Sequence, residues 1–242
     1  MKRRIPYPLL GLGLFLVISA FFTANVPLKS EQWPISVLAI MGFTAPVVIG
    51  AVQWLGKKRG LALVAGLGLY ALLFETVAIK TGVPYGRFSY GDLLGPHLFQ
   101  AAPFTVLVAW TPLVLGVLTL NQAKRWWQRV LAYTVYLVLI DVVLDPAAVK
   151  LGFWQWVQPG PYYGVPFINF CGWILSGAIA FLLVELYLKY LGRRKVGPPP
   201  RLLGYNLVGI LCFWSLVNLF ASQFVPAAIG IVLATLANRR IR

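Results

Sequence analysis

The sequence predicts an all-α integral membrane protein, a polytopic bundle of about eight transmembrane helices with both termini in the cytoplasm. Three observations lead to this fold class. Of the 242 residues, 60% are hydrophobic and only 11% are charged, whereas soluble domains carry roughly 25% charged residues. Long apolar runs recur along the whole chain, without the short alternating segments of a membrane β-barrel. Basic residues gather in short clusters between these runs.

The apolar runs give the predicted helices. A helix rises about 1.5 Å per residue, so about 20 apolar residues cross the hydrocarbon layer. By this measure the transmembrane helices are predicted at residues 8–25, 33–55, 60–80, 97–120, 129–150, 167–189, 203–221 and 223–238. The first run has no small-residue cleavage site and is interpreted as a retained helix rather than a signal peptide. The whole chain, 1–242, is treated as a single transmembrane domain.

Arginine and lysine decide between seven and eight helices, because the last two runs are nearly continuous. The basic clusters are Lys2–Arg4, Lys57–Arg59, Lys124–Arg129, Lys189–Arg201 and Arg239–Arg242. With eight helices all of them lie on one side, which the positive-inside rule makes cytoplasmic, whereas seven helices would place the last cluster outside. This distribution is typical of topology signals and contacts with anionic lipid, so the net charge of +15 does not indicate nucleic-acid binding.

Two connections on the opposite side, residues 82–95 and 152–166, are rich in Gly, Pro, Tyr and Trp. They fit either an aromatic belt at the interface or folded loops that dip into the membrane or cap a cavity, and we expect the latter. The pattern Glu75-x4-Lys80-x-Gly82 is echoed by Asp145-x4-Lys150-x-Gly152. The echo is either chance similarity or a parallel repeat with a site between its copies.

Three of the six acidic residues lie inside predicted membrane helices: Glu75, Asp141 and Asp145. An ionised carboxylate in hydrocarbon costs several kcal/mol, so these side chains are expected to face the bundle interior. The spacing of Asp141 and Asp145 puts them on one helix face, and Pro146 is expected to free the backbone carbonyl of Val142. Because all three acidic residues are predicted to lie at the same depth in the membrane, a functional site is favoured. The alternative is structural pairing, with partners among Lys80, Arg87 and Lys150.

The remaining acidic residues have ordinary interpretations. Glu31 and Asp92 belong to the outer loops. Glu185 precedes Lys189 by one helical turn, a spacing that predicts an ion pair on the helix surface.

Two carboxyl groups side by side in an apolar site cannot both ionise cheaply, so one is expected to keep its proton. A general acid beside a base can protonate an alkene and then activate water. Aromatic rings can stabilise the resulting carbocation through their faces, or serve only as interface anchors. The candidates are Trp154, Trp156, Tyr162, Tyr163 and Trp173. Asn169 is expected either to orient water or a carboxylate, or to cap its helix.

The sequence lacks the residues that several other kinds of active site require. His97 is the single histidine, which excludes histidine-rich zinc and di-iron sites, and Cys171 and Cys212 lack metal-ligand spacing. No Asn-Asp-x-x-Asp pattern for magnesium diphosphate and no nucleotide-binding loop is found. The sequence therefore predicts no metal site.

Two stretches, 74–90 and 144–173, resemble the membrane carotenoid biosynthesis protein family. The first contains Phe74-Glu-Thr and Gly82-Val-Pro-Tyr-Gly-Arg-Phe-Ser-Tyr, and the second contains Leu144-Asp-Pro and Tyr162-Tyr-Gly-Val-Pro-Phe-Ile-Asn-Phe-Cys-Gly-Trp. The resemblance covers about residues 60–180. That family includes cofactor-independent hydratases of γ-carotene and of bisanhydrobacterioruberin.

The resemblance implies addition of water across the terminal C1=C2 double bond of an acyclic carotenoid end group, giving a tertiary alcohol without a cofactor. Asp141 or Asp145 is then expected to donate the proton and Glu75 to help activate water. The motifs add Tyr85, Phe88 and Tyr90 to the substrate-binding candidates.

The implied substrate is an acyclic or monocyclic carotenoid (γ-carotene, lycopene or a bacterioruberin precursor) that enters from the membrane lipid of a prokaryotic cell membrane. The alternatives are a carotenoid cyclase similar to lycopene cyclases, a proton-coupled transporter, and a lipid-binding or assembly protein.

Overall fold

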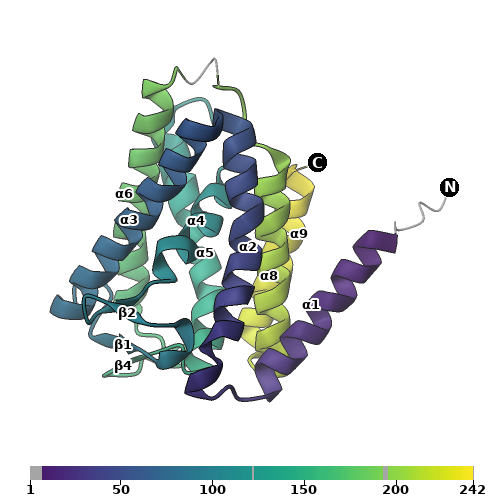
Figure 1. The fold of residues 1–242 in the computed structure, drawn as a ribbon, viewed down its shortest axis with the longest axis vertical. Coiled ribbons are helices and arrows are strands. Elements are labelled where there is room, and N and C mark those ends of the chain that lie inside the picture. Colours follow the sequence, from purple (N-terminus) through teal and green to yellow (C-terminus); the bar gives the residue numbers. More distant parts are fainter. Residues whose placement is uncertain (1–6, 122, 193–195, 242) are drawn as a thin grey trace.

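The computed structural model describes residues 7–121, 123–192 and 196–241. Helices dominate it and form one bundle (Figure 1). They are α1 (Tyr7–Asn25), α2 (Trp33–Leu55), α3 (Lys57–Thr81), α4 (Val106–Val117), α5 (Trp126–Lys150), α6 (Phe167–Tyr190), α8 (Arg201–Phe220) and α9 (Phe224–Ile241). Short 3-10 turns lie at Ser30–Gln32 and Asp92–Leu94.

Six helices in the described part of the chain, α2, α3, α5, α6, α8 and α9, are long and apolar enough to cross a membrane. The chain is thus an all-α, membrane-type bundle, and the count of eight crossings stays a prediction. Helix α4 has 12 residues, which span only about 18 Å at 1.5 Å per residue, less than the roughly 30 Å hydrocarbon core.

The predicted helix at 97–120 is wrong in its first nine residues. Strands β2 (His97–Leu98) and β3 (Ala102–Pro103) form a small hairpin there. Its turn holds Phe99 and Gln100 at positive φ. Apolar content alone suggested a helix, but non-helical backbone is tolerated at membrane depth when protein surrounds it, and Ala102 is fully buried.

The two aromatic connections pair with each other at one end of the bundle. Strand β1 (Phe88–Tyr90), after α3, is antiparallel to β4 (Trp154–Trp156), after α5, with Phe88 opposite Trp156 and Tyr90 opposite Trp154. Figure 1 shows both strands beneath the helices. The ring centroids of Tyr90 and Trp154 are 5.8 Å apart. We call the paired loops, residues 82–105 and 152–166, the cap. Their folding as a cap confirms the prediction of folded loops.

The two echoing segments share local conformation. Gly82, at the end of α3, has φ 79°, and Gly152, just after α5, has φ 72°. Both lie in the left-handed region, where a side chain is strained. Gly82 is the C-cap of α3, whereas Gly152 follows Leu151, the C-cap of α5, so the copies share a left-handed glycine but differ by one residue in where the helix ends.

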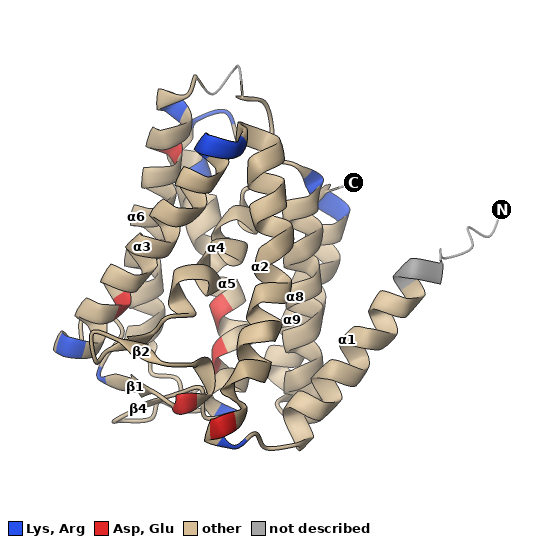
Figure 2. Ribbon diagram, in the orientation of Figure 1, with Lys and Arg blue, Asp and Glu red and all other residues tan. Residues whose placement is uncertain are grey.

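Basic residues mark the end of the bundle opposite the cap (Figure 2). At that end Glu185 of α6 is buried and receives two short hydrogen bonds from Arg129 of α5, Nε–Oε1 at 2.7 Å and Nη2–Oε2 at 2.6 Å. The predicted surface ion pair of Glu185 with Lys189 is therefore wrong. Helical spacing identifies neighbours along one helix but not the partner that a packed helix supplies.

Candidate active site

The three membrane acids lie in the half of the bundle that carries the cap. Glu75 lies in the C-terminal half of α3, and Asp141 and Asp145 lie in the C-terminal half of α5. All three side chains are buried. None forms an ion pair with a Lys or Arg of the described residues, so the structure gives no support to structural pairing with Lys80, Arg87 or Lys150.

Asn169 joins the two aspartates. Its Nδ2 donates to Oδ2 of Asp141 at 3.0 Å and to Oδ2 of Asp145 at 2.6 Å. Helix α6 starts after Pro166, which puts Asn169 in the first turn with its side chain directed at α5. Of the two roles expected for Asn169, the structure shows orientation of carboxylates. Both carboxyl groups are therefore fixed by one amide, within a few ångströms of each other.

Glu75 faces this pair from α3. It lies close enough to Asp145 for an electrostatic interaction, and its carboxyl group also interacts with the hydroxyl of Tyr90 on β1. Burial, reinforced by the negative charge of Glu75, raises the pKa of Tyr90 far above its ordinary value. Tyr90 thus stays protonated and acts as a donor. Within the described chain, Oε2 of Glu75 and Oδ1 of Asp141 have no hydrogen-bond partner, so both retain acceptor capacity.

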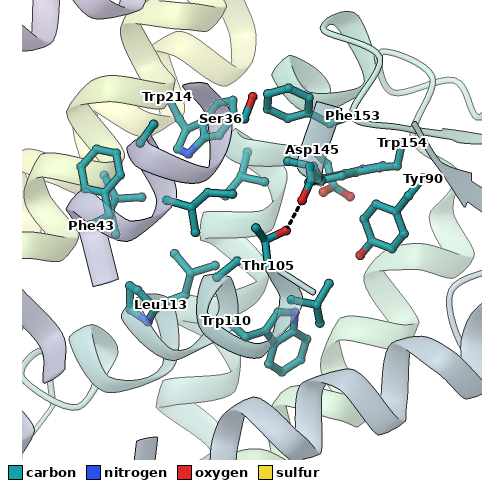
Figure 3. Close-up of a pocket in the computed structure, with 18 of the residues that line it drawn as sticks. Ser36, Phe43, Tyr90, Thr105, Trp110, Leu113, Asp145, Phe153, Trp154 and Trp214 are labelled. Atoms are coloured by element: carbon teal, nitrogen blue, oxygen red, sulfur yellow. Dashed lines mark hydrogen bonds between the residues drawn. The ribbon is translucent and has the colours of Figure 1, made fainter. Parts of the chain in front are cut away.

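A cavity of about 210 Å³ lies against the acids. A single water needs roughly 10–15 Å³ of such space, so the cavity has room for an organic group as well as water. Figure 3 shows Asp145, Tyr90 and Trp154 together on one side of it. The predicted site residues that line it are Glu75, Tyr85, Phe88, Tyr90, Asp145, Trp154, Trp156, Asn169 and Trp173.

Three predicted site residues do not line this cavity: Asp141, Tyr162 and Tyr163. Asp141 is connected to it through Asn169. The Tyr162 hydroxyl donates to the Val142 carbonyl at 3.1 Å, the group that Pro146 was expected to free. Burial raises the pKa of Tyr162 to about 12, so this phenol remains a donor. Tyr162 therefore binds the α5 backbone one turn before Pro146 and does not line the cavity. Tyr163 packs edge-on against the Tyr162 ring, with ring centroids 5.1 Å apart.

Aromatic rings form much of the cavity wall near the acids. Trp173 of α6 stacks on Trp110 of α4, with ring centroids 4.8 Å apart and planes 18° apart. Tyr85 packs beside Trp173 at 6.4 Å, and its carbonyl accepts a hydrogen bond from Nε1 of Trp156 at 2.9 Å. A Cβ on Gly172 would collide with the Tyr85 ring. The glycine therefore allows Tyr85 of the cap to pack directly against α6.

Sequence reasoning missed the walls supplied by α2, α4 and α8. Ser36 and Phe43 belong to α2, Trp110 to α4 and Trp214 to α8. The cap residues Thr105 and Phe153 were missed as well, and all six are labelled in Figure 3. The Thr105 hydroxyl donates to the Leu94 carbonyl at 2.8 Å, which fixes the cap to the start of α4. A polar residue inside an apolar run, such as Ser36, was the sequence feature that could have identified these cavity walls.

The described residues contain no group of three or more His, Cys, Asp or Glu side chains placed to hold a metal ion. The polar side chains that line the cavity carry carboxyl, amide, phenol and hydroxyl groups, set in an apolar wall. Such groups can exchange a proton with an apolar ligand and bind a water molecule.

A model of the carotenoid biosynthesis protein family matches residues 35–237. The chain belongs to this family. The match runs from α2 to α9, beyond the 60–180 region of the sequence motifs, and so includes every wall of the cavity except the contribution of residues 23 and 28.

One relative in the comparison is the bisanhydrobacterioruberin hydratase of Haloarcula japonica, with 40% identity over 195 residues. The match covers 78% of this chain and 66% of the relative, just under two thirds of its length. No solved structure matches the chain.

Proposed function

We propose that this protein is a carotenoid hydratase of the cytoplasmic membrane that adds water across the terminal C1=C2 double bond of an acyclic end group. The observation that carries the proposal is an apolar, aromatic cavity lined by Glu75, Asp145 and Asn169, with Asn169 also holding Asp141 beside Asp145. The printed name of the 40% identical relative supports the same reaction class. The expected substrates are γ-carotene, lycopene or a bacterioruberin precursor.

The proposed reaction uses one proton and one water and needs no cofactor. The Asp141–Asp145 pair donates a proton to C2, the π bond breaks, and the positive charge develops at tertiary C1. Water attacks C1 while Glu75, with its free Oε2, accepts a proton from it. The product is a tertiary alcohol. Transfer of that proton from Glu75 back to the aspartate pair restores the starting state, so atoms and charge balance.

Ring faces stabilise the cation in this proposal. The Trp110–Trp173 stack and Tyr85 lie on the cavity wall next to the acids. A cation over an aromatic face gains about 0.5–2 kcal/mol per contact, the larger value in a desolvated site. The apolar wall also limits the number of waters that can reach the cation.

The cavity favours an enzyme for an apolar substrate over a proton-coupled transporter. A transporter needs a route between the two membrane faces. The lining residues of the described cavity come from the cap, from the α1–α2 connection and from the nearby halves of the helices, with none of the basic residues of the opposite end. A cyclase would use the same proton donor, so only the product, ring-closed or hydrated, distinguishes a cyclase from a hydratase.

The first prediction concerns the product and the proton donor. Expression of the chain in lycopene- or γ-carotene-producing cells is expected to raise the pigment mass by one water. Asp145→Asn is expected to lower this conversion by about 10²-fold or more, because general acid catalysis contributes about 10²–10⁴-fold. Mass spectrometry of extracted pigments measures both results.

Asp92→Asn is the matched control, since Asp92 is an exposed carboxylate outside the cavity. It should leave conversion unchanged. A ring-closed product of unchanged mass would show a cyclase instead. Full hydration by the Asp145→Asn protein would remove Asp145 from the role of acid.

A further inference from the structure

The cavity extends well beyond the acids. Its other end is lined by Thr23 and Leu28, at and after the end of α1, and by Ile35, Ala39 and Phe43 of α2. Figure 3 places Phe43 and Trp214 on the side opposite Tyr90. The hydration chemistry uses only the acid end, so this second end needs its own explanation.

The second end reaches the outside of the bundle. Ile35 lines the cavity although its side chain is 53% exposed, and Ala39, one turn further along α2, is also exposed. Helix α1 packs against α8 and diverges from α2 (Figure 1). The cavity therefore opens sideways, next to α1, on a face where apolar side chains such as Leu38, 71% exposed, point outward.

The chemistry of the opening is suited to one kind of occupant. Its lining is apolar and partly aromatic, with Phe43, Phe213 and Trp214, and it carries no charged side chain. A conjugated polyene chain is extended and stiff, and a cavity of about 210 Å³ is too small to enclose a whole carotenoid molecule. An end group placed at the acids must therefore leave the rest of the chain outside, and an apolar lateral opening lets it remain in lipid.

We propose that this opening between α1 and α2 is a portal that holds the polyene chain of the substrate while the end group lies at the carboxyl groups. The inference rests on the proposed function and adds how the substrate is selected. In each binding event only one end group of the carotenoid lies at the carboxyl groups and is hydrated. Carotenoids with one acyclic end should be accepted whatever their other end, and substrates with two acyclic ends should be released between two separate hydrations.

The test compares two tryptophan substitutions on α2 in the full chain. Ala39→Trp fills the proposed portal, whereas Leu38→Trp adds the same ring at the neighbouring position, which faces away from the cavity. Ala39→Trp is expected to lower kcat/KM for lycopene by about tenfold or more, equivalent to roughly 1.4 kcal/mol of lost binding. Leu38→Trp should match wild type. Equal effects of both variants would overturn the portal.

A binding measurement keeps the portal separate from the reaction. In the Asp145→Asn background, purified protein is expected to retain bound lycopene, with Ala39→Trp losing it and Leu38→Trp keeping it. Pigment retained by the Ala39→Trp protein, or phospholipid alone found at this site, would overturn the portal even if hydration is confirmed. Bound pigment that depends on Ala39, without any hydration by the wild type, would instead reject the proposed reaction.

Discussion

Asn169 shows how a single side chain organises the site. An amide that donates to two carboxyl oxygens, at 3.0 and 2.6 Å, fixes both groups in one orientation. Buried polar groups need such partners, because an unpaired one costs about 1–3 kcal/mol. Asn169 is thus a positioning residue for the proposed proton donor as well as a part of the cavity wall.

Replacing Asn169 by leucine should show whether Asn169 orients the carboxyl pair for turnover or only stabilises the folded protein. The apolar side chain has similar volume but no donor, so turnover is expected to fall by about 10²-fold as the carboxyl pair loses its orientation. Carotenoid conversion per mole of folded protein measures this effect.

Asn218→Leu is the control for this prediction. Asn218 is also a buried asparagine but does not line the cavity, and its Nδ2 donates to the backbone carbonyls of Val143 and Trp214. Asn218→Leu should lower thermal stability while turnover per folded molecule is kept. If the two variants lose turnover equally, Asn169 acts only as packing.

At the scale of elements, the short helix α4 depends on close approach to α3. A Cβ on Gly68 of α3 would collide with the backbone carbonyl oxygen of Leu107 in α4. Backbone cannot move aside as easily as a flexible side chain, so glycine is required here. This contact holds α4 where Val106 and Trp110 line the cavity.

Gly68→Ala is therefore expected to destabilise the protein by about 1–3 kcal/mol, the usual cost of overpacking. Gly66→Ala is its control on the same helix, because Gly66 has open space around it. That change should be neutral or stabilising by about 0.5–1 kcal/mol, since alanine favours a helix over glycine. Thermal unfolding in detergent compares them. An unfolding temperature lowered equally in both would contradict the close α3–α4 contact.

At the scale of the whole molecule, charge is distributed along the bundle axis. Lys and Arg concentrate at the end opposite the cap (Figure 2), and the positive-inside rule predicts that this end is cytoplasmic. The cap and the acid site would then lie in the outer half of the membrane.

Single cysteines test this orientation in a Cys171→Ala and Cys212→Ala background. Val157→Cys lies in the cap and Tyr190→Cys at the end of α6, and both positions are exposed. A membrane-impermeant maleimide applied to intact cells should label the first and not the second, which reacts only after permeabilisation. The reverse pattern would invert the predicted topology.

The sequence by itself determined the membrane bundle, most helix bounds, the aromatic loops and the three acids. These follow from local rules, since apolar length, Gly and Pro positions and charges in lipid act within one segment. It mistook residues 97–105 for helix, because apolar content does not distinguish a short hairpin from a helix. It also gave Glu185 the wrong partner, because Arg129 lies on another helix, distant in sequence.

Only the tertiary structure decided which residues meet. The i, i+4 spacing of Asp141 and Asp145 was visible in the chain, but their link through Asn169 requires α6 to pack on α5. The exclusion of Tyr162 and the lateral opening beside α1 likewise depend on packing. Side-chain direction toward a cavity is a property of helices docked together, and no single helix encodes it.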